Sequence, residues 1–271
     1  MRIFVTGLGG YLGHAIARAS GPEHAISGSV RTRPAPAGSC AFTLDVRDAQ
    51  ALATALAQAR PDAVIHAAYQ QRGEAARAIN AAGSAVVARA ARDVGARLVH
   101  VSTDLVFAQA PAGRGLREDD PPAPLDPYGE SKAAAERAVA AIDPGALIVR
   151  TSLIYGGAEP GPQERLALDP AASFYRDERR CPVAAPDLAR ALLELAGRPQ
   201  LRGPLHVAGA DALSRLELAR LLAAAAGRDP ATLAASDRPP GRAGDLTLDC
   251  SRAQALLATR LRGAREVLGG A

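Results

Sequence analysis

The sequence predicts an α/β protein built on a doubly wound parallel sheet, with a smaller C-terminal region that binds the substrate. Three observations lead to this prediction. Short apolar strands alternate with helices over roughly the first 150 residues, which is the pattern of such a sheet. A glycine-rich turn joins the first strand to the first helix. Hydroxyl and acidic side chains follow later strands, at the edge where open parallel sheets bind ligands.

The composition is that of a globular protein with a packed core. Of the 271 residues, 48% are hydrophobic but only 3% are aromatic and none is Trp, so the core must consist mainly of Ala, Val, Leu and Ile. The net charge of +4 comes from arginines spread along the chain, without a basic run. We therefore expect no nucleic-acid partner, although a mild positive field favours a small anionic ligand.

Three cysteines, Cys40, Cys181 and Cys250, are widely spaced and form no metal-ligand pattern. They predict reduced thiols in a cytoplasmic protein without a metal site. The chain opens directly on the strand Arg2 to Val5, and no apolar run approaches membrane-spanning length. We expect no signal peptide and no membrane partner.

The first strand, Ile3 to Thr6, runs into the loop Gly7-Leu8-Gly9-Gly10-Tyr11-Leu12-Gly13 and then into a helix from His14 to Ala19. The spacing Gly7-x-x-Gly10-x-x-Gly13 lets the backbone turn tightly and approach a pyrophosphate at the helix N-terminus. A strand, glycine loop and helix in this order predict a Rossmann-type dinucleotide site at these glycines, Tyr11 and Leu12. A purely structural turn is the alternative.

The second strand, Ala25 to Val30, is expected to end near the adenosine ribose. Arg31 and Arg33 follow it without a carboxylate, which favours NADP(H) over NAD(H); the alternative is two solvated loop arginines. Phe42 to Leu44 is the third predicted strand. Asp45 and Val46 follow this strand and can meet the adenine of the cofactor. Asp45 can instead cap the helix from Ala49 to Ala59, and the sequence favours neither alternative.

The strand Ala63 to His66 is followed by Ala67 and Ala68, small residues that let the backbone lie flat against a cofactor. A long helix from Ala75 to Val94 contains Asn80. The next strand, Leu98 to Val101, ends in Ser102-Thr103-Asp104, whose hydroxyls are expected to face the ligand crevice unless they serve only as caps and turns. Ala110 to Pro124, rich in Pro, Gly and acidic residues, is predicted to be an exposed loop.

Lys132 is the only lysine of the chain, whereas arginines make up the other basic residues. It stands four residues after Tyr128 in Tyr128-Gly129-Glu130-Ser131-Lys132, and Asp126 and Pro127 are typical of a helix start. Both side chains then share a helix face, where an ammonium favours ionisation of the phenol and makes Tyr128 an acid or base. An ordinary surface helix is the alternative.

We place a boundary after Tyr155, because Gly, Pro and Arg then replace the strand and helix alternation that ends with the strand Ala146 to Thr151. Residues 1–155 form the dinucleotide-binding domain, and residues 156–271 mainly bind the substrate. A helix near residues 187–196 is expected to pack back on the first domain. A strand at Leu205 to Val207 and a capped helix from Ser214 to Ala226 follow. The five histidines are scattered singly and are predicted to be surface or packed residues.

In this order, the glycine loop, the Ser102-Thr103-Asp104 turn and Tyr128-x-x-x-Lys132 resemble the extended short-chain dehydrogenase/reductases, and within them the dTDP-4-dehydrorhamnose reductase group. The matching stretches cover nearly the whole chain: residues 5–13, 60–68, 101–107, 124–132, 148–152, 186–189, 205–209 and 248–252.

The resemblance implies that Tyr128 is the general acid, that Lys132 holds the nicotinamide ribose and that Thr103 hydrogen-bonds the reacting carbonyl. Asn80 matches a supporting asparagine. The residues implied in substrate binding are Thr103, Asp104, Val106, Phe107 and Tyr128. Hydride transfer to a ketone independently requires an oxygen stabiliser and a proton donor. No metal is implied.

One segment departs from the group. Residues 156–181 lack its asparagine-aromatic stretch and amphipathic helix and carry an arginine cluster at Arg176, Arg179 and Arg180. If this cluster folds over the crevice, it attracts a diphosphate.

We expect an NADPH-dependent ketoreductase of a 4-keto-6-deoxy sugar nucleotide, as a monomer or homodimer. The alternatives are a catalytically silent, dinucleotide-binding regulatory or scaffold subunit, and an epimerase of the same superfamily. A dehydratase is disfavoured because it needs further acidic acid/base residues.

Overall fold

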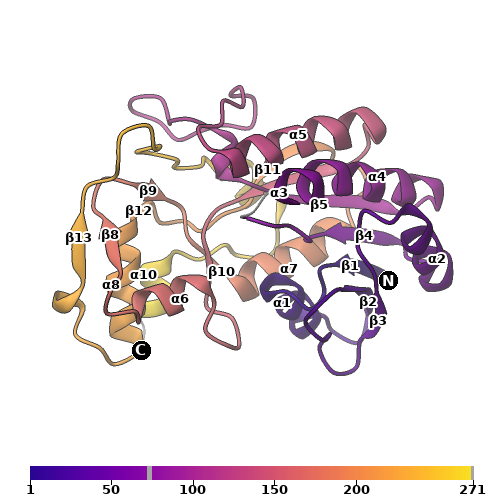
Figure 1. The fold of residues 1–271 in the computed structure, drawn as a ribbon, viewed down its shortest axis with the longest axis horizontal. Helices are drawn as coiled ribbons and strands as arrows, with labels where there is room; N and C mark the ends of the chain where they lie inside the picture. Colours follow the sequence, from indigo (N-terminus) through magenta and orange to yellow (C-terminus); the bar gives the residue numbers. More distant parts are fainter. Residues whose placement is uncertain (72–74, 270–271) are drawn as a thin grey trace.

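The computed structural model describes residues 1–71 and 75–269 (Figure 1). Its centre is a seven-stranded parallel sheet in the order β11-β6-β5-β4-β1-β2-β3. The strands are β1 (Arg2–Thr6), β2 (Ala25–Val30), β3 (Cys40–Thr43), β4 (Ala63–His66), β5 (Arg97–Thr103), β6 (Leu147–Thr151) and β11 (Gly203–His206). The chain starts in the middle and winds outward in both directions, which confirms the predicted doubly wound, Rossmann-type sheet.

Helices cover both faces of this sheet (Figure 1). They are α1 (Tyr11–Ala19) and α7 (Ala185–Ala196) on one face, and α2 (Ala49–Ala59), α4 (Gly83–Asp93) and α5 (Pro127–Ile142) on the other. Ile16 and Leu192 belong to the apolar core under the first pair, and Leu56 and Val87 to the core under the second group. The inner strands β4 and β6 are buried on both faces, so their continuous apolar runs identify them in the sequence, whereas the edge strand β3 is mostly exposed.

The helix predicted from Ala75 to Val94 is present but changes its winding. Residues Ala75–Arg77 form α3, Ala78–Ala82 a π-helical turn, and α4 continues from Gly83. Asn80 lies in the π-helical turn and is buried. Such turns are rare and are frequent at functional sites, and no sequence signal predicted this one.

The second half of the chain is divided between the sheet and a smaller lobe. Helix α7 packs against α1, and β11 adds the last strand of the sheet beside β6. Most of the other elements build the lobe on the left of Figure 1 around a core that includes Tyr155, Phe174 and Leu213. These elements are β7 (Ile154–Tyr155), α6 (Pro162–Ala167), β8 (Ser173–Tyr175), β9 (Arg179–Arg180), β10 (Val183–Ala184), β12 (Leu213–Ser214), α8 (Arg215–Ala225), a 3-10 turn (Pro230–Thr232), β13 (Ala234–Ser236) and α10 (Ala264–Gly269). Helix α9 (Ser251–Leu256) instead packs against β11 of the central sheet.

One expectation for the connecting segments holds with an exception, and another is wrong. The segment from Ala110 to Pro124 is a mostly exposed loop, as predicted, but Leu116 in it is buried and pairs with Leu248 in an isolated bridge. The segment after Tyr155 does contain a short helix, α6. Pro162 occupies its first turn, and the Glu164 carboxylate accepts a hydrogen bond from the Gly161 backbone N–H (2.9 Å).

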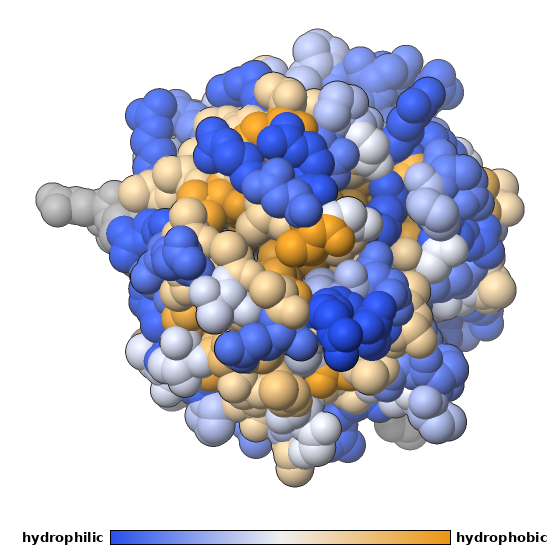
Figure 2. All heavy atoms as spheres, turned by 90° about the vertical axis from the view of Figure 1, so that its right-hand side faces the viewer, coloured by the Kyte–Doolittle hydropathy of each residue, from blue (hydrophilic) through white to orange (hydrophobic). Residues whose placement is uncertain are grey.

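The surface carries mainly hydrophilic side chains on the face seen in Figure 2, with small separate apolar areas. Within residues 1–71 and 75–269, no helix is long and apolar enough to cross a membrane, and no group of three or more His, Cys, Asp or Glu residues could hold a metal ion. All three cysteines are free thiols, Cys40 exposed and the other two buried.

Candidate active site

The glycine loop lies between β1 and α1, where the sequence places it. Gly7 has a positive φ of 72°, and a Cβ there would lie 3.0 Å from the Ala68 Cα. A Cβ on Gly13 would lie within 2.4 Å of the Gly7 carbonyl oxygen, so this glycine serves the packing of helix on loop. Gly10 precedes α1 without a side-chain cap, and the first turn of α1 has no acidic residue. An uncapped N-terminus of this kind suits an anion such as a pyrophosphate.

A cavity of about 370 Å³ opens beside this loop, and we call it the nucleotide cleft. Nine predicted cofactor residues line it: Gly7, Gly10, Tyr11, Arg31, Arg33, Asp45, Val46, Ala67 and Ala68. Further lining residues were not predicted: Gly9, Ser29, Val30, Thr32, Leu44, Tyr69, Gln70, Ile79, Pro162 and Arg165. Four predicted cofactor residues do not line the cleft: Leu12 packs into the core, Gly13 packs against its own loop, and Tyr128 and Lys132 lie on α5 outside the lining.

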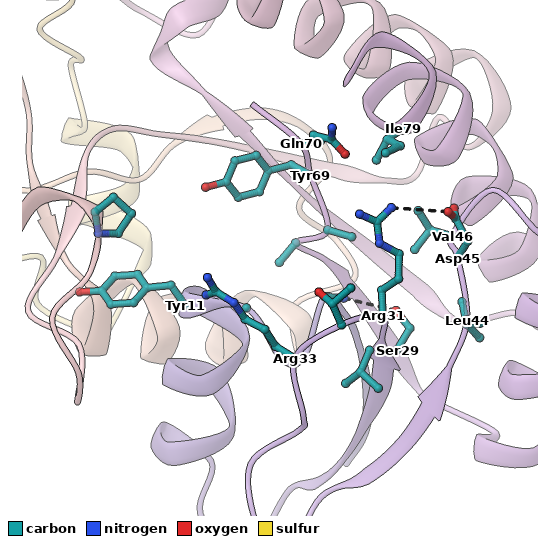
Figure 3. Close-up of a pocket in the computed structure, with 18 of the residues that line it drawn as sticks. Tyr11, Ser29, Arg31, Arg33, Leu44, Asp45, Val46, Tyr69, Gln70 and Ile79 are labelled. Atoms are coloured by element: carbon teal, nitrogen blue, oxygen red, sulfur yellow. Dashed lines mark hydrogen bonds and ion pairs between the residues drawn. The ribbon is translucent and has the colours of Figure 1, made fainter. Parts of the chain in front are cut away.

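The two arginines after β2 enter the cleft in different directions (Figure 3). Arg31 points toward Asp45 and forms an ion pair of 3.7 Å with it, whereas Arg33 extends toward Tyr11. Hydrogen bonds from Arg47 and the nearby Arg31 charge lower the pKa of Asp45 to about 2. Asp48, not Asp45, caps α2 by accepting a hydrogen bond from the Ala51 N–H (3.0 Å). The capping alternative for Asp45 is therefore wrong.

Tyr11 connects the glycine loop to the smaller lobe. Its hydroxyl accepts a hydrogen bond from the Gly157 N–H (2.7 Å) and donates to Glu164 Oε1 (3.3 Å). A Cβ on Gly157 or Gly161 would lie 2.5 Å from the Tyr11 ring, so the ring fits closely between these two glycines. Burial raises the pKa of Tyr11 to about 12. The side chain therefore closes one end of the cleft as a neutral phenol.

Helix α5 begins as predicted, with Asp126 accepting hydrogen bonds from the Tyr128 N–H (2.9 Å) and the Gly129 N–H (3.0 Å). This start packs tightly on the turn after β5, since a Cβ on Gly129 would lie 2.1 Å from the Leu105 carbonyl oxygen. The Tyr128 ring lies 6.0 Å from that of Tyr69, which lines the cleft. Tyr128 thus lies between the nucleotide cleft and the turn that carries Thr103.

The predicted shift of Tyr128 toward the phenolate is wrong for this geometry. Burial raises the pKa of Tyr128 well above its ordinary value, and the negative charge of Asp104 raises it further. Arg180 offsets this only in part. Burial outweighs any nearby cation here, so Tyr128 is a neutral phenol that can give a proton.

Lys132 is buried one turn further along α5 and has neutral partners. Its ammonium donates to the Val101 carbonyl oxygen (2.7 Å) and lies 3.5 Å from His100 Nε2. Burial lowers the pKa of Lys132 to about 8. Burial and the Lys132 charge also lower the pKa of His66 to about 3 and that of His100 well below its usual range. The predicted reading of these two histidines as packed residues fits their burial.

Thr103 and Asp104 form the buried centre of a polar network. The Thr103 hydroxyl donates to Asp104 Oδ1 (3.1 Å) and accepts from the Leu105 N–H (3.2 Å). Arg180 donates to both Asp104 oxygens, to Oδ2 at 2.6 Å, and Ser152 also donates to Oδ2 (2.5 Å). Asp104 is fully buried. Its carboxylate therefore has its hydrogen-bond partners within the protein, and one of them is the Thr103 hydroxyl, which it holds in place.

Asn80 supports the site from the π-helical turn. Its amide donates to the Ser131 hydroxyl (2.9 Å) and to the Gln70 carbonyl oxygen (2.7 Å), and its Oδ1 accepts from the Gln70 N–H (2.8 Å). These bonds join α5 to the segment that lines the cleft.

The remaining predicted substrate residues are packed inside the protein. Val106 and Phe107 are buried, and the Phe107 ring contacts His206 edge-on and the guanidinium of Arg150 at 4.9 Å. Both side chains belong to a hydrophobic core cluster, so they are closed to direct contact with a substrate here.

The expected cluster of Arg176, Arg179 and Arg180 does not form. Arg176 pairs with the exposed Asp237, Arg179 donates to the Ala212 carbonyl oxygen, and Arg180 points inward to Asp104. Alternating residues of a short strand point to opposite sides, so neighbours in sequence separate.

The doubly wound sheet, the uncapped glycine loop beside a cleft and the Tyr128 site define an NAD(P)-dependent oxidoreductase of the extended short-chain dehydrogenase/reductase group. More particularly, the chain belongs to the RmlD substrate binding domain family, which it matches over residues 1–270.

Two curated relatives place the chain within this family. It is 33% identical to the dTDP-4-dehydrorhamnose reductase of Mycolicibacterium smegmatis, over 98% of this chain and 84% of that protein. It is also 29% identical to methionine adenosyltransferase 2 subunit beta of Xenopus laevis, over 93% of this chain and 81% of that protein.

Solved structures share the fold. The dTDP-4-dehydrorhamnose reductase of Bacillus anthracis, solved in complex with NADP, superposes with a TM-score of 0.81 at 25% identity, covering 99% of this chain and 97% of that one. The Bordetella bronchiseptica enzyme WbmH, in complex with NAD⁺, has a TM-score of 0.85 at 21% identity, covering 100% and 96%. At that identity the second likeness concerns the fold alone.

Proposed function

We propose that this protein uses NADPH to reduce the keto group of a sugar nucleotide, of the 4-keto-6-deoxy type. The observation that carries the proposal is the position of Tyr128. It lies between Tyr69, at the nucleotide cleft, and the Thr103 turn, on which the start of α5 is packed. A proton donor is needed at the meeting point of cofactor and carbonyl. The similarity to dTDP-4-dehydrorhamnose reductases supports the substrate class.

The cleft fits a dinucleotide because the N-terminus of α1 has no side-chain cap, so its backbone N–H groups are available to a pyrophosphate. A side chain on Gly7 would collide with Ala68, so glycine keeps this part of the loop compact. The bound cofactor would supply the hydride. Tyr128 gives the proton to the carbonyl oxygen, a role that its raised pKa suits in the direction of reduction. The buried Lys132 ammonium donates hydrogen bonds to the ribose hydroxyls. Its N–H groups are available for this because no carboxylate among the described residues pairs with it.

Thr103 hydrogen-bonds the carbonyl oxygen in this scheme. To do so, its hydroxyl must turn away from Asp104 Oδ1. Asp104 loses little by this change, because Arg180 and Ser152 still donate to the carboxylate. The network thus leaves Thr103 free to serve the substrate.

NADPH is the proposed cofactor rather than NADH. Arg31 and Arg33 line the cleft after β2, and the Asp45 carboxylate near them already pairs with Arg31 and Arg47. Two arginines suit a 2′-phosphate better than a 2′-hydroxyl.

A panel of dTDP-, UDP- and GDP-linked 4-keto sugars tests the proposal through NADPH oxidation. We expect turnover with at least one, and a loss on the order of a thousandfold in Tyr128→Phe with NADPH binding retained. Undiminished turnover in Tyr128→Phe would contradict the assignment of the proton donor.

The second candidate is a dinucleotide-binding subunit without catalytic activity. The similarity to methionine adenosyltransferase 2 subunit beta favours this candidate. It predicts tight NADPH binding without turnover on any ketone of the panel. The Thr103, Tyr128 and Lys132 side chains, all retained in this chain, favour the reductase.

A further inference from the structure

Arg215 is a partly buried arginine whose charge the protein does not pair. It is the first residue of α8, and its backbone N–H donates to the Glu178 carbonyl oxygen (2.9 Å). In the part of the chain that the structure describes, its guanidinium has no hydrogen-bond or ion-pair partner. Arg215 is only half-buried, and none of its nitrogens is among the buried side-chain atoms that lack a partner, so its unpaired guanidinium is open to a ligand.

The surroundings of Arg215 hold more positive than negative charge. Arg180 and Arg242 both bind the Glu178 carboxylate, and Arg180 also binds Asp104. Three arginines therefore share two carboxylates, and both carboxylates are already engaged. Burial, together with the charges of Arg180 and Arg242, lowers the pKa of Arg215 to about 10. A ligand anion would supply the missing partner.

The site lies on the substrate side of the reacting centre. Ser214, the residue before Arg215, pairs with Arg179 across β12 and β9, which lie together above α8 in Figure 1. Arg180 of β9 reaches Asp104, which in turn holds Thr103. Arg215 does not line the nucleotide cleft. An anion bound here would thus belong to the substrate and not to the cofactor.

We propose that Arg215 binds the phosphate or diphosphate of the substrate and so makes the enzyme selective for nucleotide-linked ketones. This assignment rests on the proposed function, because a sugar nucleotide carries such a diphosphate near its sugar. It gives the expected diphosphate contact to Arg215 instead of the cluster of Arg176, Arg179 and Arg180. Arg180 remains committed to Asp104.

The test compares Arg215→Gln with Arg220→Gln, an exposed arginine on the same helix. Calorimetry measures binding of dTDP and UDP in the presence of saturating NADP⁺, which blocks the nucleotide cleft. We expect the wild type and Arg220→Gln to bind alike, and Arg215→Gln to bind at least tenfold more weakly. The melting temperature of Arg215→Gln is expected to be equal or slightly higher, since the substitution removes a partly buried charge that has no partner.

Turnover separates this inference from the proposed function. With a sugar nucleotide that is reduced, Arg215→Gln should raise KM about tenfold while kcat changes less than threefold. Weaker nucleoside diphosphate binding in Arg215→Gln without wild-type turnover on any sugar nucleotide would support this site and reject the proposed reaction. Turnover with an unchanged KM in Arg215→Gln, or no nucleoside diphosphate binding by the wild type, would overturn the role of Arg215.

Discussion

Lys132 and Arg180 are both buried cations near Tyr128, but the protein holds them in opposite ways. The Lys132 ammonium meets a carbonyl oxygen and a neutral histidine. Arg180 meets the carboxylates of Asp104 and Glu178. Burial lowers the pKa of Lys132 to about 8, whereas the two carboxylates overcome burial and raise the pKa of Arg180.

The difference distinguishes a cation that is available to a ligand from a cation that stabilises the fold. A cation with two carboxylate partners is satisfied before any ligand arrives and fixes the residues around it. A cation with neutral partners is held at a cost that a ligand can offset. By this criterion we propose that Lys132 and Arg215 face ligands, whereas Arg180 holds Asp104, which bonds Thr103.

The largest expected effect is on turnover at Lys132. Lys132→Met should lower kcat with a reducible ketone by on the order of a thousandfold, since the ribose contact and the positive charge are lost. Its melting temperature should be equal or higher, because a methionine carries no charge to bury. Steady-state kinetics and thermal unfolding measure the two effects. A variant that is inactive only because it unfolds would contradict this view.

Arg180 should behave in the reverse way. Arg180→Met leaves Asp104 and Glu178 buried with one partner fewer, and we expect the free energy of unfolding to fall by about 3–5 kcal/mol. Urea denaturation measures this fall. The matched control is Arg176→Met, which removes an exposed ion pair with Asp237 and should cost at most about 1 kcal/mol. Equal losses in the two variants would remove the distinction between paired and unpaired cations.

The sequence predicted the parts of the fold that local patterns encode. The strands of the first domain are continuous apolar runs, and the glycine loop and Asp126 cap are local signals, so all were located. The third strand begins two residues earlier than predicted, at Cys40, because it is an edge strand with an exposed surface. That β11 would pair with β6 depends on packing between distant segments, which no local pattern records.

The site was predictable to the same extent. The spacing of Tyr128 and Lys132 identified a shared helix face, and nine residues of the cleft follow from strand ends. Arg165 enters the cleft from a short helix of the other lobe, and Arg180 reaches Asp104 across 76 residues. These contacts depend on how two lobes meet, so sequence patterns gave no signal for them.

The titration of Lys132 should appear in stability at alkaline pH. Its pKa is about 8 in the folded protein and 10.5 in the unfolded chain, so the unfolded state binds the extra proton between these values. Stability therefore rises with pH through this window. From pH 7.5 to 9.5 the wild type should gain about 2 kcal/mol relative to Lys132→Met. Other groups titrate in both proteins, so urea denaturation of the pair isolates Lys132, and parallel pH profiles would show that burial does not lower the pKa of Lys132 in the folded protein.

The smallest effect concerns Arg31, which is intermediate between the two cases because its partner Asp45 lies 3.7 Å away and both are partly exposed to solvent. Arg31→Ala should weaken NADPH binding and leave NADH binding nearly unchanged, since only the 2′-phosphate needs the guanidinium.

Asp45→Asn should act in the opposite direction, because Arg31 is then released from its ion pair toward the ligand. An exposed pair contributes at most about 1 kcal/mol, so the gain in the NADPH to NADH affinity ratio should be less than about fivefold and should shrink in high salt. Fluorescence titration with both cofactors measures these ratios. An affinity ratio that Arg31→Ala leaves intact would assign the recognition of the 2′-phosphate to Arg33 alone, the arginine that points toward Tyr11 and has no ion pair among the described residues.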